Sequence, residues 1–136
     1  MPLHDIPIQV AGIAGQLTGN AAALLREVAA LLESLVRTGE GGAIDLKSLP
    51  LSAADRDWLL ERLGQGEVEI NLNIAGGSRI VETAYAGVWW VAHRNENGII
   101  TSEFIEVSYA PELVSAHPDD VESGLDFLNS ALAEAT

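Results

Sequence analysis

The chain has 136 residues, close to the commonest size of a single domain, so we expect one domain over residues 1–136. Its 20 acidic residues against 7 Lys and Arg give a net charge of −13, which repels nucleic-acid phosphates and anionic lipid head groups. The absence of cysteine excludes disulfides and thiolate-ligated zinc or iron–sulfur sites. We therefore expect neither nucleic acid nor a membrane surface as a partner.

The N-terminal stretch is uncharged from residue 6 to residue 25, yet it is too polar and too rich in glycine for a membrane-spanning helix. Residues 1–20 are predicted to form a loose arm, and the alternation of Ile6, Ile8 and Val10 leaves a short edge strand as the alternative. The basic segment of a secretory signal is missing, so we expect a cytoplasmic protein.

The segment 21–64 is predicted to be helical. Apolar residues at a helical period mark its first helix: Leu24, Leu25, Val28, Leu31, Leu32, Leu35 and Val36. The pair Gly41–Gly42 predicts a loop, and Ser52 with Asp55 predicts a capping box at the start of a second helix. The apolar side of that second helix consists of Trp58, Leu59, Leu60 and Leu63.

Residues 67–109 are predicted to form an antiparallel sheet of three to four strands. Val68, Ile70, Leu72 and Ile74 alternate with polar residues, as in a strand with one buried face. A second extended run begins at Ser78, bends at Ala86–Gly87 and reaches Arg94, and a third spans Ile99–Tyr109. Turns are expected at Gly76–Gly77 and at residues 95–98.

A last helix is predicted over residues 118–134, with Val121, Leu125, Leu128 and Leu132 on one stripe. That stripe needs apolar surface to cover, and the sheet is the candidate. The predicted fold class is therefore α+β, an antiparallel sheet with the N-terminal and C-terminal helices packed on one face.

Several segments in the same order resemble the C-terminal module of the HupH/HyaF family of hydrogenase expression proteins. They are residues 80–91 (IVETAYAGVWWV), residues 103–107 with Pro111, and the upstream stretches 41–46, 49–51 and 63–68. The resemblance implies a non-enzymatic, chaperone-like accessory protein without a cofactor, acting in maturation of uptake nickel–iron hydrogenase. The implied partners are the hydrogenase small-subunit precursor and other maturation proteins. The chain is short for that family, so it resembles a HupJ-type member.

The candidate partner-binding residues are Glu82, Trp90, Glu103 and Glu106, and we expect no catalytic residue. The three carboxylates would serve an enzyme only if they lay in a concave pocket with a raised pKa, which leaves a carboxylate-dependent enzyme as an alternative. Trp89 and Trp90 are adjacent in a strand and must face opposite sides of the sheet. We expect Trp89 in the core and Trp90 exposed, beside the carboxylates.

The small subunits of such hydrogenases carry a twin-arginine signal, as the resemblance implies, and clustered carboxylates hold guanidinium groups well. We therefore expect the acidic, aromatic sheet region to contact the precursor. The three histidines, His4, His93 and His117, show no ligand spacing, and no metal site is predicted. A mean hydropathy of +0.19 together with an uncharged arm predicts a homodimer, and a purely structural homodimer is a further alternative.

Overall fold

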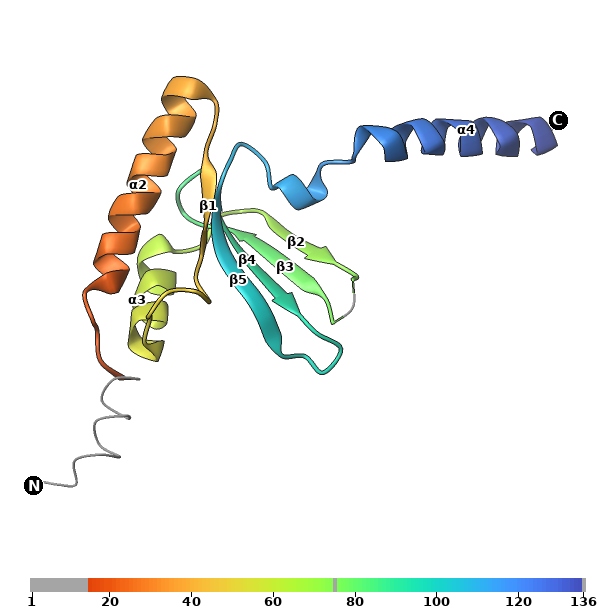
Figure 1. Ribbon diagram of the computed structural model, residues 1–136. Coiled ribbons are helices and arrows are strands. Elements are labelled where there is room, and N and C mark those ends of the chain that lie inside the picture. The colour runs from red at the N-terminus through yellow and green to blue at the C-terminus, as the bar shows by residue number, and fades with distance from the viewer. Residues whose placement is uncertain (1–14, 75, 136) are drawn as a thin grey trace, which may run out of the picture.

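The computed structural model describes residues 15–74 and 76–135. Its elements in chain order are α2 (Asn20–Thr38), β1 (Gly42–Asp45), α3 (Ala53–Leu63), β2 (Glu69–Leu72), β3 (Ser78–Glu82), β4 (Val88–Arg94), β5 (Ile100–Val107), the short 3-10 helix η1 (Glu112–Val114) and α4 (Pro118–Ala135) (Figure 1). The fold class is α+β, as predicted. The strand alternative at Ile6, Ile8 and Val10 lies outside the described residues, as does most of the predicted arm.

The sheet is antiparallel with five strands in the order β1-β5-β4-β3-β2, so the prediction of three to four strands was too low. The extra strand, β1, pairs with the far end of β5, where Gly42 faces Val107. The Gly41–Gly42 pair is what allows this close pairing, because a Cβ built on Gly41 would lie 1.8 Å from the Val107 carbonyl oxygen. The run from Ser78 to Arg94 is also two strands, separated by a turn in which Gly87 has φ +88°.

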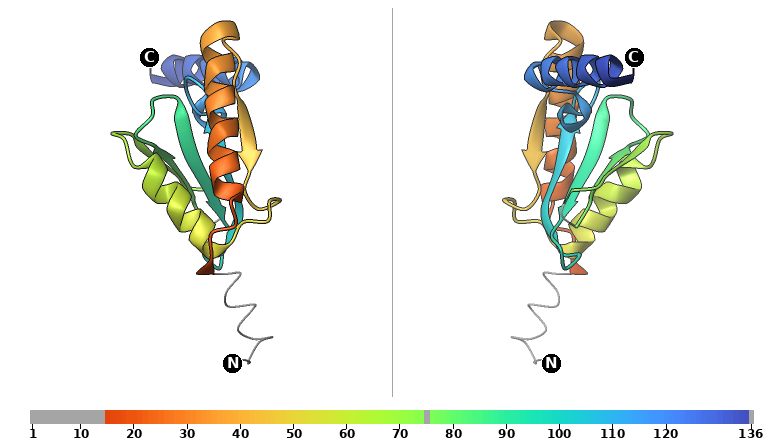
Figure 2. Two further views of the ribbon diagram at one scale, coloured as in Figure 1. Left: turned by 90° about the vertical axis from the view of Figure 1, so that its left-hand side faces the viewer. Right: turned by 90° about the vertical axis from the view of Figure 1, so that its right-hand side faces the viewer.

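One face of the sheet is covered by α2 and α3, which lie on the same side of the strands in Figure 1 and in front of them in the left view of Figure 2. The core between them contains Ala21, Leu24, Val28, Leu35, Ile44, Leu46, Leu59, Leu63, Val88, Trp90, Ile105 and Val107. The capping box predicted for α3 is present: the Ser52 hydroxyl accepts from the Asp55 amide, and the Asp55 carboxylate accepts from the Ser52 amide. We call the side of the sheet that α2 and α3 cover the helix face.

The last part of the predicted arm is fixed to the start of α3. The Thr18 amide and hydroxyl both donate to the Asp55 carboxylate, at 2.9 and 2.6 Å, and the Ser52 hydroxyl donates to the Gln16 carbonyl oxygen. Burial by itself would raise the pKa of Asp55, but the hydrogen bonds from Thr18 and Ser52 outweigh it and lower that pKa. Residues 16–18 are therefore anchored, contrary to the prediction of a loose arm up to residue 20.

The second face of the sheet, which we call the open face, has a small core of its own. Ile80, Trp89 and Val91 are buried there, with Ile70, Leu72 and Phe104 packed against them. The C-terminal helix does not cover either face: α4 extends away from the sheet, and no residue from Pro118 to Ala135 is buried (Figure 1). The prediction that this helix packs on the sheet is wrong: α2 and α3 complete the helix-face core, and the buried residues of the open face pack against side chains of neighbouring strands.

Candidate functional site

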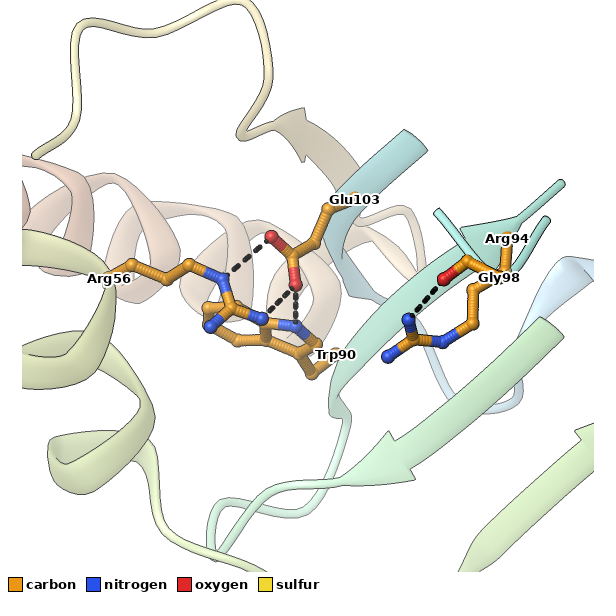
Figure 3. A network of polar contacts seen from close by, with 5 residues as sticks. All are labelled: Arg56, Trp90, Arg94, Gly98 and Glu103. Atoms are coloured by element: carbon orange, nitrogen blue, oxygen red, sulfur yellow. Dashed lines mark hydrogen bonds and ion pairs between the residues drawn. The ribbon is translucent and has the colours of Figure 1, made fainter. Parts of the chain in front are cut away.

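A buried polar network joins α3 to the middle of the sheet (Figure 3). The guanidinium of Arg56 makes two parallel bonds to Glu103, Nε to Oε1 at 2.9 Å and Nη2 to Oε2 at 2.6 Å. The indole Nε1 of Trp90 donates to the same Oε2 at 2.9 Å, and the Arg56 guanidinium lies 5.7 Å from the centre of the Trp90 ring. These contacts fix all three side chains, since both oxygens of the buried carboxylate are occupied.

The charge of Glu103 is stabilised inside this network. Burial alone would raise the pKa of Glu103, but the hydrogen bonds from Arg56 and Trp90, together with the positive charge of Arg56, lower it below its ordinary value. A carboxylate with a lowered pKa stays ionised at neutral pH and is a poor general acid.

Trp90 is buried, with only 7 % of its surface exposed, so the prediction that it is the exposed member of the tryptophan pair is wrong. The two indoles do face opposite sides of the sheet, Trp90 in the helix-face core and Trp89 in the open-face core. Both are buried because each face has its own apolar cluster. The Trp89 Nε1 donates to the Ser108 carbonyl oxygen at 3.1 Å.

Glu82 and Glu106 lie on the open face, in one row across the sheet with Trp89 between them. Glu82 accepts from the backbone amides of Glu67 and Val68, and both bonds use Oε1. Glu106 accepts from the Ser108 hydroxyl and the Glu112 amide, and both bonds use Oε2. The sheet therefore separates the four predicted site residues into two pairs, Glu82 with Glu106 on the open face and Trp90 with Glu103 on the helix face.

The helix face also has a cleft of about 450 Å³ between α3 and strands β3 to β5, which was not predicted from the sequence. Glu103, Trp90 and Arg56 line it, together with Arg79 and Arg94. The Arg94 Nη1 donates to the Gly98 carbonyl oxygen at 2.9 Å (Figure 3). We call this the arginine cleft.

The apolar stripe of α4 is exposed along its whole length. Val121, Leu125, Leu128 and Leu132 each keep 56–58 % of their surface exposed. Asp120 and Glu122 border the stripe in the first turn, Asp119, Asp126 and Glu134 lie on the opposite side of the helix, and the segment contains no Lys or Arg. An apolar stripe with acidic residues beside its first turn is thus available for contact with another molecule.

The two histidines within the described part of the chain have local partners. His93 Nδ1 is bonded to the Ser78 hydroxyl at 2.5 Å, and His117 Nδ1 accepts from the Asp119 amide at 3.1 Å. Over residues 15–74 and 76–135, no group of three or more His, Asp or Glu side chains is arranged to hold a metal ion. No helix in those ranges has both the length and the apolar character needed to cross a membrane.

The family described as HupH hydrogenase expression protein, C-terminal conserved region, matches residues 18–135. The chain is 34 % identical over 86 residues to the hydrogenase expression/formation protein HoxQ of Azotobacter vinelandii, covering 63 % of this chain and 30 % of that protein. It is 32 % identical over 113 residues to the hydrogenase expression/formation protein HupH of Rhodobacter capsulatus, covering 83 % of this chain and 41 % of that protein. The matched part of the chain thus covers 30 % and 41 % of the length of these two relatives.

A solved structure gives a more complete match. The hydrogenase expression protein HupH from Thiobacillus denitrificans superposes with a TM-score of 0.81 at 45 % sequence identity. The match covers 86 % of this chain and 98 % of that one. Fold and sequence therefore agree on the same group of proteins.

Proposed function

The chain belongs to the HupH hydrogenase expression protein family, and from this premise we propose that it is a non-enzymatic, chaperone-like accessory protein that binds the hydrogenase small-subunit precursor. Its relatives are hydrogenase expression/formation proteins, which supports a role in hydrogenase maturation. The observation that carries the finer proposal is the exposed stripe of α4, a contact surface without a partner in the described fold.

The chemistry of α4 fits a segment that combines apolar side chains with arginine. Burying Leu125 and Leu128 against an apolar signal segment would remove their exposed surface from water. The carboxylates at the borders of the stripe, such as Asp120 and Glu122, would face guanidinium groups of the same segment. The proposed contact with the precursor therefore lies on α4 and not on the sheet region expected from the sequence.

The open-face carboxylates keep a secondary role in this proposal. Glu106 lies in a groove that leads along β5 to His117 and Pro118, where α4 begins. Glu82 uses one oxygen for two backbone amides, and Glu106 uses one for a backbone amide and the Ser108 hydroxyl, so in each the other oxygen can accept from a partner guanidinium. Trp90 and Glu103 contribute indirectly, by holding Arg56 and the sheet in place.

A non-catalytic role is supported by the separation of the carboxylates. Glu103 lies on the opposite face from Glu82 and Glu106, so the three cannot act on one substrate. Glu103, which lines the arginine cleft, has a lowered pKa, whereas a general acid at neutral pH needs a raised one.

The test is a titration of the full chain with a synthetic peptide that carries the twin-arginine signal of the small-subunit precursor. The double variant L125S/L128S should weaken binding at least about tenfold, because it removes the centre of the apolar stripe. Val36→Ser is the matched control, since Val36 is an exposed apolar residue on α2, 79 % exposed. Equal binding by L125S/L128S and the parent chain would contradict the proposal.

The carboxylates are tested by the salt dependence of the same titration. Rim charges steer association, so Glu82→Gln and Glu106→Gln should lower the on-rate at low salt and have little effect at high salt. Binding that does not change with salt, and that neither variant alters, would remove the carboxylates from the proposed surface. The α4 contact would still be decided by the L125S/L128S titration.

A second copy of the chain is the competing partner for the same stripe. In a parallel pair of α4 helices the acidic first turns, with Asp120 and Glu122, would lie side by side, and like charges so placed are destabilising. A homodimer through this stripe is therefore favoured by an antiparallel arrangement or by a high salt concentration. Light scattering of the parent chain and of L125S/L128S at high concentration measures this: loss of a dimer mass in the variant would assign the stripe to self-association.

A further inference from the structure

The arginine cleft on the helix face, away from α4, has the features of a ligand site. It is concave, it has a volume of about 450 Å³, and three of the chain's 7 basic side chains line it, namely Arg56, Arg79 and Arg94. We infer that this cleft binds a monoanionic carboxylate attached to an aliphatic body. The inference is independent of the proposed contact between α4 and the hydrogenase precursor.

The three guanidinium groups differ in how far their charge is already neutralised. Arg56 is bonded through two nitrogens to the buried Glu103 carboxylate, so its charge is matched. Arg79 pairs with Glu69 at 2.9 Å, but both side chains are about half exposed, and such surface pairs exchange partners at little cost. Arg94 donates to a neutral carbonyl oxygen, that of Gly98, and no carboxylate of the described residues lies within ion-pair distance of it. Arg94 therefore provides the free positive charge.

The floor of the cleft is small and apolar. In the strand register Ala92 lies between Arg79 of β3 and Glu103 of β5. Its methyl group leaves space that a larger side chain at this position would occupy. Leu60 of α3, Val81 of β3 and Ile100 of β5 add apolar lining. An aliphatic body can thus rest on Ala92 while its charged end faces Arg94, both on the same side of β4.

The pairing of the three guanidinium groups selects the ligand's charge. Glu103 matches the charge of Arg56 and Glu69 matches that of Arg79, so Arg94 is the guanidinium that remains for a ligand. A single carboxylate balances the charge of Arg94, whereas a phosphate dianion would place a second negative charge near Glu61 and Glu103, which also line the cleft. The volume lies within the range of small-molecule sites, which are commonly about 300–1,000 Å³.

The ligand chemistry has two sources, a free aliphatic acid or the end of a polypeptide chain. The probes are 4-methylpentanoate for the first and N-acetyl-leucine for the second, each titrated into the full chain and followed by ¹H–¹⁵N NMR. The Trp90 indole and the Ala92 amide should shift, with a Kd on the order of 1 mM for so small a ligand. Shifts with both probes indicate that a chain end fits, and shifts with 4-methylpentanoate alone indicate a free acid.

N-acetyl-leucinamide is the matched neutral ligand, and it should produce shifts at least about tenfold weaker because it lacks the charge. Arg94→Gln should weaken binding of the acids about tenfold, and Ala92→Leu should abolish it by filling the floor. Arg37→Gln, which removes one exposed arginine from α2, should leave binding unchanged. Because Ala92→Leu can also disturb the strand, Arg94→Gln decides the outcome. Equal binding of acid and amide, or no effect of Arg94→Gln, would overturn the inference.

Discussion

Two helices of nearly equal length, α2 and α4, carry the same kind of apolar stripe, but the stripe of α2 is buried and that of α4 is exposed. On α2, of 19 residues, Leu24, Val28 and Leu35 are buried against the sheet and α3. On α4, of 18 residues, the corresponding leucines remain more than half exposed. The difference lies in what the rest of the fold offers each helix.

The helix face offers rows of apolar side chains that point toward α2, including Val88, Ile105 and Val107. On the open face, Ile80, Trp89 and Val91 are buried by packing against Ile70, Leu72 and Phe104 of the sheet itself, without a helix. An amphipathic helix thus indicates that an apolar partner exists, and the packing of the other elements decides whether it is in the same chain.

A matched pair of leucine truncations tests most directly whether the α2 stripe is packed and the α4 stripe is not. Leu24→Ala on α2 should lower the free energy of unfolding by about 2–5 kcal/mol, because it leaves a cavity in the core. Leu128→Ala on α4 should change it by less than about 0.5 kcal/mol, since that side chain is 58 % exposed. Urea denaturation measures both. Similar losses at the two sites would mean that α4 packs on the domain in solution.

Two arginine–carboxylate pairs allow the same comparison between a buried and an exposed contact. Glu103→Gln keeps the shape of the side chain but removes its charge from the pair with Arg56, and it should cost about 1–3 kcal/mol. Glu69→Gln removes the charge from the exposed pair with Arg79 and should have a clearly smaller effect. Equal effects in urea denaturation would show that burial does not strengthen the Arg56–Glu103 contact.

The lowered pKa of Glu103 also predicts how stability depends on pH. A carboxyl with a lower pKa in the folded than in the unfolded state contributes stability that is full above the unfolded value, about 4.3, and is lost as pH falls through the folded value. Asp55 acts in the same direction. The loss of stability below about pH 4.3 should therefore be less steep in Glu103→Gln than in the parent chain. Parallel pH profiles would contradict the role given to Glu103.

Much of this fold can be predicted from local sequence patterns. The predictions that were wrong concern long-range packing. The helical period from Leu24 to Leu35 and the Ser52–Asp55 capping box predict α2 and α3 correctly, because they depend on neighbours in sequence. The strand β1 was missed because its partner, β5, lies some 60 residues away, and Gly41–Gly42 reads as a loop unless that pairing is known. Similarly, the sequence shows the stripe of α4 but not that the buried residues of the open face pack against neighbouring strands and not against that helix.

The site was less predictable than the fold. Alternation along β4 places Trp89 and Trp90 on opposite faces, but the burial of both depends on two separate cores. The same alternation puts Trp90, Ala92 and Arg94 on one side of β4, a signal for the arginine cleft that the sequence does contain. Arg56 and Arg79 join them only through the docking of α3 and the register of β3, which no local pattern encodes.

The smallest expected effect concerns the helix propensity of α4 alone. Gly124 lies within α4, and a Cβ built there meets no atom within 4 Å, so alanine fits without strain. Gly124→Ala should stabilise the helix locally by about 0.5–1 kcal/mol, because glycine loses more backbone entropy on helix formation. Hydrogen exchange of α4 amides should then slow about threefold, whereas the urea midpoint of the domain should not move, since α4 and the core do not share a packed interface.

A helix ordered in advance also binds with a smaller loss of entropy, so the same variant should bind the precursor peptide more tightly. A shift of the urea midpoint would show instead that α4 unfolds together with the core, and the contrast between α2 and α4 would have to be withdrawn.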